Sequence, residues 1–281
     1  MVYEKELRKS DCARSLLKVQ STGRIKRYMA VFVEQRDRVA SITIDRPPLN
    51  VLDSALLREL DAVLTSCAQL PAADIVVLRG AGARAFSAGV DIKEHTREKV
   101  PEMLDIVHGV MRKLLALPQV TVALVRGACL GGGCELASCC DFILASEESV
   151  FATPEILVGC YPPVALARFS ALIGYHRAAE MILTGRTVAA QEAARIGLIN
   201  RALPAAELEG GLETLLEELL GKSGAVLRLT VKGLRELSLV GFAQALRRSE
   251  EIYRRELLPT EDVEEGVQAF LAKRKPRWSH K

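Results

Sequence analysis

The period of apolar and polar positions changes repeatedly along the chain, which predicts alternating strands and helices. The segments MAVFVEQ (29–35) and VASITIDRP (39–47) carry β-branched residues on either side of the polar turn at 36–38, so they predict a hairpin. A helix is predicted next, because the following apolar residues keep a 3.6-residue spacing and Asp53 can cap the first turn. These apolar residues are Leu56, Leu57, Leu60, Val63, Leu64 and Cys67.

Two continuous apolar segments, DIVVLR (74–79) and VTVALVRG (120–127), are typical of strands buried on both faces. A helix is predicted between them at 103–117, and FILAS and SVFA predict two further short strands after Asp141. This order of elements implies crossover connections and a mainly parallel sheet. Beyond Tyr175 the pattern is helical, so an α/β core with a helical appendage is expected.

The last helical segment, TEDVEEGVQAFLAKRK (260–275), begins with acidic residues and ends with basic ones, as the helix dipole favours. Its apolar residues Val263, Val267, Phe270 and Leu271 lie on one face. We expect that face to be buried against the rest of the protein.

The composition narrows the class of protein. Apolar residues make up 49% and charged residues 26% of the 281 residues, and the net charge is +3. These values describe an ordinary globular protein and do not favour a disordered or nucleic-acid-coating one. No apolar run reaches the roughly 18 residues that span a membrane. Seven cysteines without a secretory signal favour reduced thiols in a cytoplasmic protein.

No metal site is predicted. Four of the cysteines fall between Cys129 and Cys140, but the chain has no Cys-x-x-Cys pair. The four histidines, which include His95 and His108, lie far from this cluster in the sequence.

Candidate chemistry is concentrated in GACLGGGCELASCCDFILASEESVFATPE (127–155). The glycines at 131–133 connect a buried strand to a predicted helix start, where unpaired backbone N–H groups can hold a phosphate or a developing oxyanion. The segment has neither the Lys-Ser/Thr of a P-loop nor a GxGxxG pattern, which disfavours nucleoside triphosphate and dinucleotide sites. A tight strand-to-helix crossing explains the glycines equally well.

Glu135 and Glu155 are both predicted in the first turn of a helix, the second behind Thr153 as N-cap and Pro154. Carboxylates at such positions often only complement the helix dipole. Two desolvated carboxylates beside a glycine-lined strand end can instead share acid and base catalysis. The residues alone leave both interpretations open.

Three segments, AFSAGVDIKE (85–94), GACLGGGCELASCCDFILAS (127–146) and FATPEILVG (151–159), resemble the enoyl-CoA hydratase/isomerase family, the crotonases. The stretches at 184–204 and 260–278 are similar to the family as well. The resemblance implies a crotonase-type α/β fold, a spiral of ββα turns with a C-terminal helical trimerisation region. The corresponding divisions are an N-terminal extension at 1–28, the spiral core at 29–204 and the helical region at 205–281.

The resemblance also implies roles for individual residues. Ala88 and Gly132 match the residues whose N–H groups polarise the thioester carbonyl, and Glu135 and Glu155 match the carboxylates that activate water and deliver a proton. Further substrate contacts are implied for Leu49, Asn50, Ala85, Phe86, Asp91, Ile92, Tyr161, Pro163 and Val164. Asp91 can equally be a structural cap. No cofactor is expected beyond the coenzyme A of the acyl-CoA substrate, and a homotrimer or dimer of trimers is expected.

One segment departs from the family's pattern. Hydratases of the family usually have a proline and a glycine-rich turn after PEILVG, whereas this chain has CYPPVAL (160–166). Proline and apolar residues there predict a stiffer backbone and a reshaped acyl pocket. Simple drift in a packing loop is the alternative.

The substrate expectation follows from the same residues. The double proline, together with RPPLNVLD (46–53), resembles the cyclohexa-1,5-diene-1-carbonyl-CoA hydratases of anaerobic aromatic degradation. This implies hydration of an alicyclic dienoyl-CoA. The alternatives are a generic 2-enoyl-CoA hydratase or isomerase of fatty-acid oxidation and an RNA-binding member of the family. Only the basic amino terminus, which includes Arg24, Lys26 and Arg27, supports the RNA-binding alternative.

Overall fold

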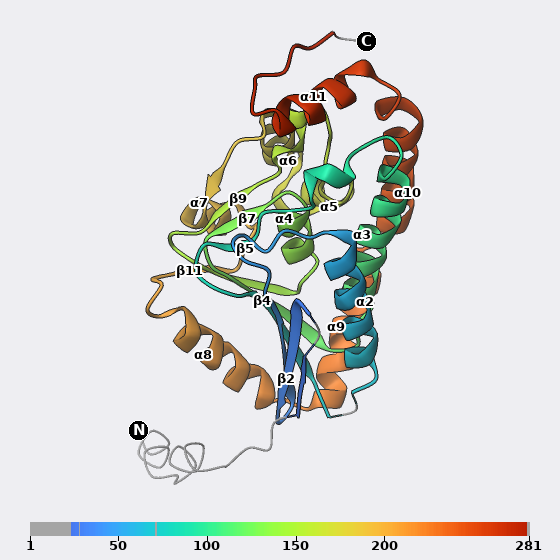
Figure 1. Ribbon diagram of the computed structural model, residues 1–281. Coiled ribbons are helices and arrows are strands. Elements are labelled where there is room, and N and C mark those ends of the chain that lie inside the picture. Colours follow the sequence, from blue (N-terminus) through green and yellow to red (C-terminus); the bar gives the residue numbers. More distant parts are fainter. Residues whose placement is uncertain (1–23, 28, 71, 280–281) are drawn as a thin grey trace, which may run out of the picture.

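The computed structural model describes residues 24–27, 29–70 and 72–279, and consists of two β-sheets with helices around them (Figure 1). The predicted extension at 1–28 lies mostly outside these residues. Its last part forms strand β1 (Arg24–Arg27), which pairs antiparallel with β2 (Val31–Arg36). The sheet therefore begins before the predicted boundary, and the basic residues of β1 belong to it.

The large sheet has seven strands in the order β1-β2-β3-β4-β6-β8-β11. Strands β2 and β3 form the predicted hairpin, and all neighbours from β3 onward are parallel, which confirms the mainly parallel arrangement. The strands after β2 are β3 (Val39–Ile44), β4 (Ile75–Gly80), β6 (Val120–Val125), β8 (Phe142–Ser146) and β11 (Arg201–Leu203).

The small sheet has the order β10-β9-β7-β5. Its strands are β5 (Ala85–Ser87), β7 (Ala128–Leu130), β9 (Val150–Ala152) and β10 (Val188–Ala189). The chain places one strand in each sheet in turn, as β4 and β5, β6 and β7, then β8 and β9, and a helical segment follows each pair. This is the predicted spiral of ββα turns. The predicted strands FILAS and SVFA are β8 and β9, which lie in different sheets.

Helical segments surround both sheets (Figure 1). In the core they are α2 (Ser54–Ala68), η1 (Ile92–Glu94), α3 (Val100–Leu115), α4 (Gly132–Ser138), η2 (Pro154–Val158), α5 (Pro163–Ile173), α6 (Tyr175–Thr184) and α7 (Ala190–Ile196). The carboxy-terminal ones are α8 (Leu208–Leu220), α9 (Gly224–Ser238), α10 (Phe242–Ile252), the π-helical turn η3 (Tyr253–Leu257) and α11 (Glu261–Leu271). Helix α5 lies where the sequence predicted a stiffened loop.

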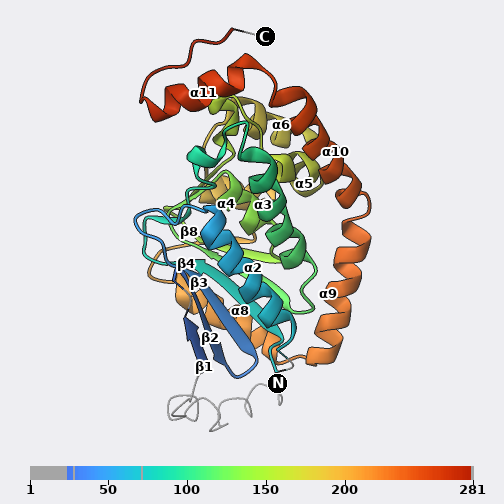
Figure 2. The same ribbon diagram turned by 45° about the vertical axis from the view of Figure 1, so that its right-hand side comes forward.

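Helix α2 and strand β4 show how the apolar pattern determines the core. All six apolar residues predicted for α2 are buried, and the carboxylate of Asp53 accepts a hydrogen bond from the N–H of Leu56 at 2.9 Å. In β4, Val76 and Leu78 pack in the cluster that includes α2 and α3, whereas Ile75 and Val77 pack in the cluster that includes α8. The sheet is thus covered on both faces, as the continuous apolar segment predicted (Figure 2).

Helix α11 is only partly buried, unlike the prediction. Val263 and Val267 are buried, but Phe270 is 56% exposed and Leu271 is 42% exposed. The apolar spacing identified a face that is wider than the surface against which the helix packs.

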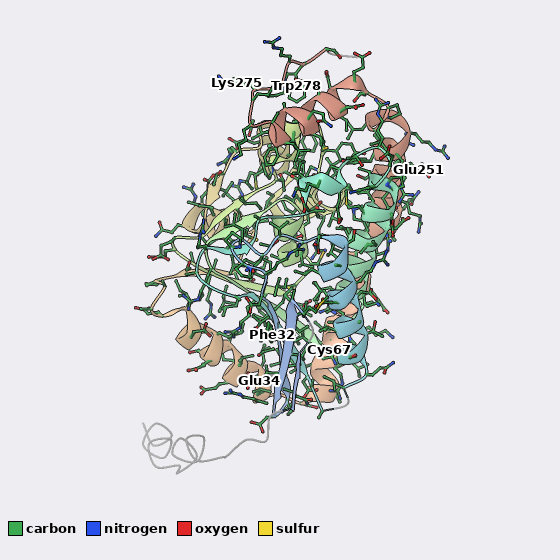
Figure 3. All side chains as sticks on the ribbon, viewed as in Figure 1. Phe32, Glu34, Cys67, Glu251, Lys275 and Trp278 are labelled. Carbon is green, nitrogen blue, oxygen red and sulfur yellow. The ribbon has the colours of Figure 1, made fainter. Side chains whose placement is uncertain are left out.

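The two ends of the molecule are formed by different elements. Figure 3 shows Phe32 and Glu34 of β2 at one end, and Lys275 and Trp278 beside α11 at the other. Helix α10, which carries Glu251, lies toward the second end. Two elements at that end, η3 and α11, contribute Tyr253 and Phe270 to the cavity described next.

Candidate active site

Three loops meet where the strands of the small sheet end. Strands β5, β7 and β9 are parallel neighbours, so the segments that follow them leave the same edge of the sheet. A cavity of about 350 Å³ lies between these segments, helix α3, the start of α5 and the carboxy-terminal elements. Ala88, Gly132, Glu135 and Glu155 line it, which brings together the four residues predicted for the oxyanion hole and the acid/base pair.

Glu135 lies in the first turn of α4 and is 3% exposed. Its Oε1 accepts hydrogen bonds from the backbone N–H groups of Val164 at 2.8 Å and Ala165 at 2.9 Å, both in the first turn of α5. Burial raises the pKa of this carboxyl, and the two N–H groups and His108 act in the opposite direction. The site therefore provides stabilisation for the anionic form of Glu135.

Glu155 lies in the 3₁₀ turn η2, opposite the start of α4. Its Oε2 is buried and has no hydrogen-bond partner among the residues that the structure describes. Burial raises the pKa of this carboxyl well above its ordinary value, and the nearby Glu135 raises it further. The environments of the two carboxyls thus separate their pKa values, which favours Glu155 as the acid and Glu135 as the base.

The local structure around Glu155 differs from the prediction in one respect. Thr153 precedes η2, but its side chain makes no capping hydrogen bond, and its hydroxyl lacks a partner in the described chain. Pro154 does begin the helical turn, as predicted. A 3₁₀ turn this short positions Glu155 without the N-cap that a longer helix favours.

The glycines at 131–133 permit the close approach of neighbouring groups. Gly131 has a φ of 51°, and a Cβ there would lie 2.8 Å from Oε1 of Glu155. A Cβ on Gly132 would lie 2.7 Å from Cγ2 of Val90. Side chains at these positions would displace either the acid or the loop that follows β5, so the glycines serve the site and not only the crossing.

The backbone donors at the site differ from the predicted pair. The N–H of Ala88 donates to the carbonyl oxygen of Leu49 at 2.9 Å, which leaves it unavailable to a substrate. Two residues later, the N–H of Val90 has no acceptor within the part of the chain that the structure describes, and it lies next to Gly132. The predicted donor Ala88 is therefore corrected to Val90, while Gly132, at the first position of α4, retains an N–H that the helix does not use.

Some of the other predicted substrate-binding residues line the cavity and some do not. Ile92, Tyr161 and Pro163 line it. The remaining six do not: Leu49, Asn50, Ala85, Phe86, Asp91 and Val164. A role for them along the coenzyme A chain, where no contact is described, stays a prediction.

Several of these six residues have structural tasks instead. The side chain of Asn50 accepts from the N–H of Arg46 at 2.9 Å and donates to the carbonyl oxygens of Ala81 and Ala85 at 3.1 and 2.8 Å. The carboxylate of Asp91 accepts a hydrogen bond from the N–H of Lys93 at 3.0 Å and so caps the turn η1, as the structural alternative for this residue predicted. Ala85 and Phe86 are buried in strand β5, and Val164 binds Glu135 through its backbone.

The CYPPVAL segment forms the start of α5. Pro162 precedes the helix, and Pro163 occupies its first position, where proline is favoured because it needs no N–H partner. The hydroxyl of Tyr161 donates to the carbonyl oxygen of Ser249 at 2.6 Å. The segment thus begins a helix, and the first turn of that helix aims two N–H groups at Glu135. The stiffer backbone and the reshaped acyl pocket stay predictions.

Sequence reasoning missed two cavity residues, His108 and Tyr253. His108 lies on α3, where its ring is buried and its Nδ1 is 2.7 Å from Oε1 of Glu250. Tyr253 is buried beside Tyr161, with the two rings edge to face and their centroids 5.0 Å apart. A histidine on the apolar face of a predicted helix, one turn after Leu104, was the available signal.

A larger hollow, of about 960 Å³, lies between α9 and the core, and two of the charged residues that line it, Arg235 and Asp141, are paired with each other. Arg235 donates from Nε to Asp141 at 2.8 Å and from Nη2 to the carbonyl oxygen of Gln119 at 3.0 Å. This buried pair connects α9 to the large sheet. The carboxyl pair of the smaller cavity is therefore the candidate catalytic centre.

The described residues offer neither a cluster of metal ligands nor a membrane-spanning helix. No group of three or more His, Cys, Asp or Glu in this part of the chain is placed to hold a metal ion. None of the helices there has the length and apolar character to cross a membrane. The thiols near the site are buried, and burial raises the pKa of Cys160 to about 11 and that of Cys139 to about 12.

The chain is similar to known proteins over most of its length. A model of the family described as "Enoyl-CoA hydratase/isomerase" matches residues 34–281. A probable enoyl-CoA hydratase of Rhizobium meliloti is 37% identical over 271 residues, which cover 90% of this chain and 99% of the relative. The cyclohexa-1,5-dienecarbonyl-CoA hydratase of Thauera aromatica is 30% identical over 253 residues, covering 90% of this chain and 97% of that protein.

Solved structures are similar over the same range. The crystal structure of an enoyl-CoA hydratase from Mycobacterium avium subsp. paratuberculosis has a TM-score of 0.81 and 29% identity, and covers 90% of this chain and 100% of that chain. The family match and these relatives show that the chain belongs to the enoyl-CoA hydratase/isomerase family.

Proposed function

We propose that the protein is an acyl-CoA hydratase that adds water to a conjugated enoyl or dienoyl thioester. The observation that carries the proposal is the pair of buried glutamates in unlike environments. Glu135 has two backbone donors from α5, whereas Oε2 of Glu155 has no partner among the described residues, and both face one cavity beside the unused N–H groups of Val90 and Gly132. The two relatives named above carry hydratase names, which supports this reaction class.

The backbone donors act on the thioester. Its carbonyl oxygen accepts hydrogen bonds from the N–H groups of Val90 and Gly132, and negative charge grows on that oxygen as the enolate forms. Fixed donors stabilise this charge more in the transition state than in the substrate, and each contributes about 3 kcal/mol in comparable sites.

The glutamates move the protons. Ionised Glu135 takes a proton from water while the water oxygen bonds to the β-carbon, and protonated Glu155 delivers its proton to the α-carbon. The double bond is consumed and a hydroxyacyl thioester results, with Glu135 protonated and Glu155 ionised. One proton transfer between them through water restores the starting state, so the sum of the steps is addition of one water.

The favoured acyl group is an alicyclic dienoyl. The double proline, the RPPLNVLD stretch and the similarity to the Thauera aromatica enzyme support it. The higher identity to the Rhizobium meliloti protein supports the second candidate, a generic 2-enoyl-CoA hydratase. RNA binding is not proposed, since no observation in the described residues favours it, and most of the basic amino terminus that suggested it lies outside them.

We also propose self-association through the carboxy-terminal helical region, as a homotrimer or a dimer of trimers. Several large apolar residues of α9 and the turn after it are at least 60% exposed: Val226, Leu229, Leu234, Leu237 and Val240. An apolar surface of this kind supports a protein contact. A cytoplasmic location, the division near residues 28 and 204, and the absence of a cofactor other than substrate coenzyme A belong to the same proposal.

Incubation with an enoyl-CoA in ¹⁸O-labelled water tests the reaction. Hydration places the label in the hydroxyl of the acyl product, whereas isomerisation places none there. Comparison of kcat/KM for cyclohexa-1,5-diene-1-carbonyl-CoA and crotonyl-CoA then tests the acyl group. A preference for crotonyl-CoA would exclude the alicyclic substrate and leave the hydratase.

A further inference from the structure

A third polar group, apart from the two glutamates, faces the cavity from helix α3. His108 lines the cavity and its side chain is 1% exposed. Its Nδ1 is 2.7 Å from Oε1 of Glu250 on α10, which also accepts from Nη1 of Arg112 at 3.1 Å. Its Nε2 is buried and has no hydrogen-bond partner within the described chain.

The carboxylate of Glu250 fixes the tautomer of His108. The hydrogen bond with His108 lowers the pKa of Glu250, so this carboxyl is ionised and can only accept. Nδ1 must therefore carry the proton that the two groups share. In the neutral imidazole, Nε2 is then an acceptor, and the Glu250 contact holds it in a fixed orientation.

The other residues that α3 contributes to the cavity wall are apolar. Met103, Leu104 and Val107 of α3 line the same cavity. A pure hydrocarbon acyl group would cover Nε2 and leave it without a hydrogen bond, which buried polar atoms rarely tolerate. An acyl group with a hydrogen-bond donor at this position would satisfy it.

Tyr253 adds a third such polar atom to the cavity, after Oε2 of Glu155 and Nε2 of His108. Its hydroxyl has no oxygen or nitrogen partner in the part of the chain described, and lies beside the thiol of Cys160, a weak hydrogen-bonding group. Tyr253 follows Glu250 by three residues, so one stretch of chain orients His108 and supplies this hydroxyl. The cavity thus contains an acceptor and a donor that the proposed hydration does not use.

We infer that the substrate's acyl group carries a hydroxyl, distinct from the one that hydration creates, which donates a hydrogen bond to Nε2 of His108. The inference rests on the proposed hydration, but not on the hydrocarbon acyl groups named with it: it specifies the substrate as an enoyl-CoA whose acyl group, alicyclic or open-chain, carries a hydroxyl. His108 is then a specificity-determining residue, and Glu250 is a positioning residue that holds its tautomer.

Binding of unreactive saturated thioesters tests the inference without turnover. Titration calorimetry compares hexanoyl-CoA with its 4-, 5- and 6-hydroxy derivatives on the full-length protein. At least one hydroxy derivative is expected to bind about tenfold more tightly than hexanoyl-CoA, since a buried acceptor is satisfied. Equal or weaker binding of all three derivatives would overturn the inference, and would indicate that water satisfies Nε2.

Variants of His108 locate the effect. His108→Leu is expected to abolish the preference for the hydroxyl, and His108→Gln, which keeps a polar group on the cavity wall, is expected to retain part of it. Leu104→Met, one turn away on the same wall, is the matched control and should keep the preference. The same preference in His108→Leu as in the native protein would overturn the assignment to His108.

Crotonyl-CoA hydration by the same preparations separates the two proposals. Hydration without a hydroxyl preference in binding contradicts this inference alone. A hydroxyl preference without hydration of any enoyl-CoA contradicts the hydratase alone.

Discussion

Glu135 and Glu155 follow neighbouring strands of one small sheet, β7 and β9, yet only Glu135 receives hydrogen bonds from a helix start. The first turn of α5 directs two N–H groups at Glu135, whereas Oε2 of Glu155 is buried without a donor in the described residues. The same residue type is therefore favoured as a base at one position and as an acid at the other. Backbone donors, which no side-chain motif encodes, make this difference.

Replacing either glutamate by glutamine is expected to have the largest effect, and it tests the roles that the two environments favour. Glu135→Gln removes the base and Glu155→Gln removes the acid, so each is expected to lower kcat by about 10² to 10⁴-fold. Binding of a saturated acyl-CoA should remain within a few-fold in both variants, because neither carboxyl holds the thioester. Full activity in either variant, measured as loss of enoyl-CoA absorbance, would contradict the assignment of that residue.

Gly131→Ala tests whether close packing places the acid. A Cβ at this position would lie 2.8 Å from Oε1 of Glu155, and the φ of 51° is unfavourable for alanine. Displacement of the acid by a fraction of an ångström to 1 Å is expected to lower kcat by about 10 to 100-fold. Gly210→Ala on α8 is the control, since a Cβ there meets nothing within 4 Å. Equal kcat in the two variants would show that the position of Glu155 does not depend on Gly131.

The elements that were predicted correctly depend on local sequence. Helix α2 follows from the spacing of residues such as Leu56, Leu60 and Leu64, and β4 from one continuous apolar segment. Helix α5 was missed because Pro162 and Pro163 favour a turn in isolation, and only the helix that follows shows them to be its start.

The site was predictable where a motif places the residue itself, and not where contacts across the chain decide. Glu135, Glu155 and Gly132 were named from the sequence. The choice between Ala88 and Val90 depends on which of their N–H groups donates to a carbonyl oxygen in the segment from Leu49 to Leu52. That contact joins segments distant in the sequence, so no local pattern predicts it. The His108 contact with Glu250 joins residues 142 positions apart, so no local pattern links them.

The pH dependence of kcat/KM is expected to have two limbs. Activity is lost at low pH as Glu135 gains a proton, and at high pH as Glu155 loses its proton. Burial raises the pKa of both carboxyls, so the optimum should lie above the ordinary glutamate range, with a fall of about tenfold per pH unit beyond each limb. The limbs describe the interacting pair and not one residue each. A profile that is flat between pH 5 and pH 9 would contradict an acid and base pair.

The smallest effect concerns stability, and it distinguishes the two glutamates without catalysis. The pKa of Glu155 is raised in the folded state, so below its unfolded value near 4.5 both states are protonated and the carboxyl has no pH-dependent effect. As the pH rises past that value, the unfolded chain ionises first, and the folded protein loses stability until the folded pKa is passed. Glu155→Gln cannot ionise and avoids this loss.

The Tm of Glu155→Gln is therefore expected to exceed that of the native protein by a margin that grows from pH 5 to pH 8, at about 2 to 4 °C for each kcal/mol. Glu135→Gln, which weakens two charge-assisted hydrogen bonds, should gain less, and exposed Glu148→Gln serves as the control for net charge. Equal shifts for Glu135→Gln and Glu155→Gln would mean that the N–H groups of α5 do not distinguish the two carboxyls.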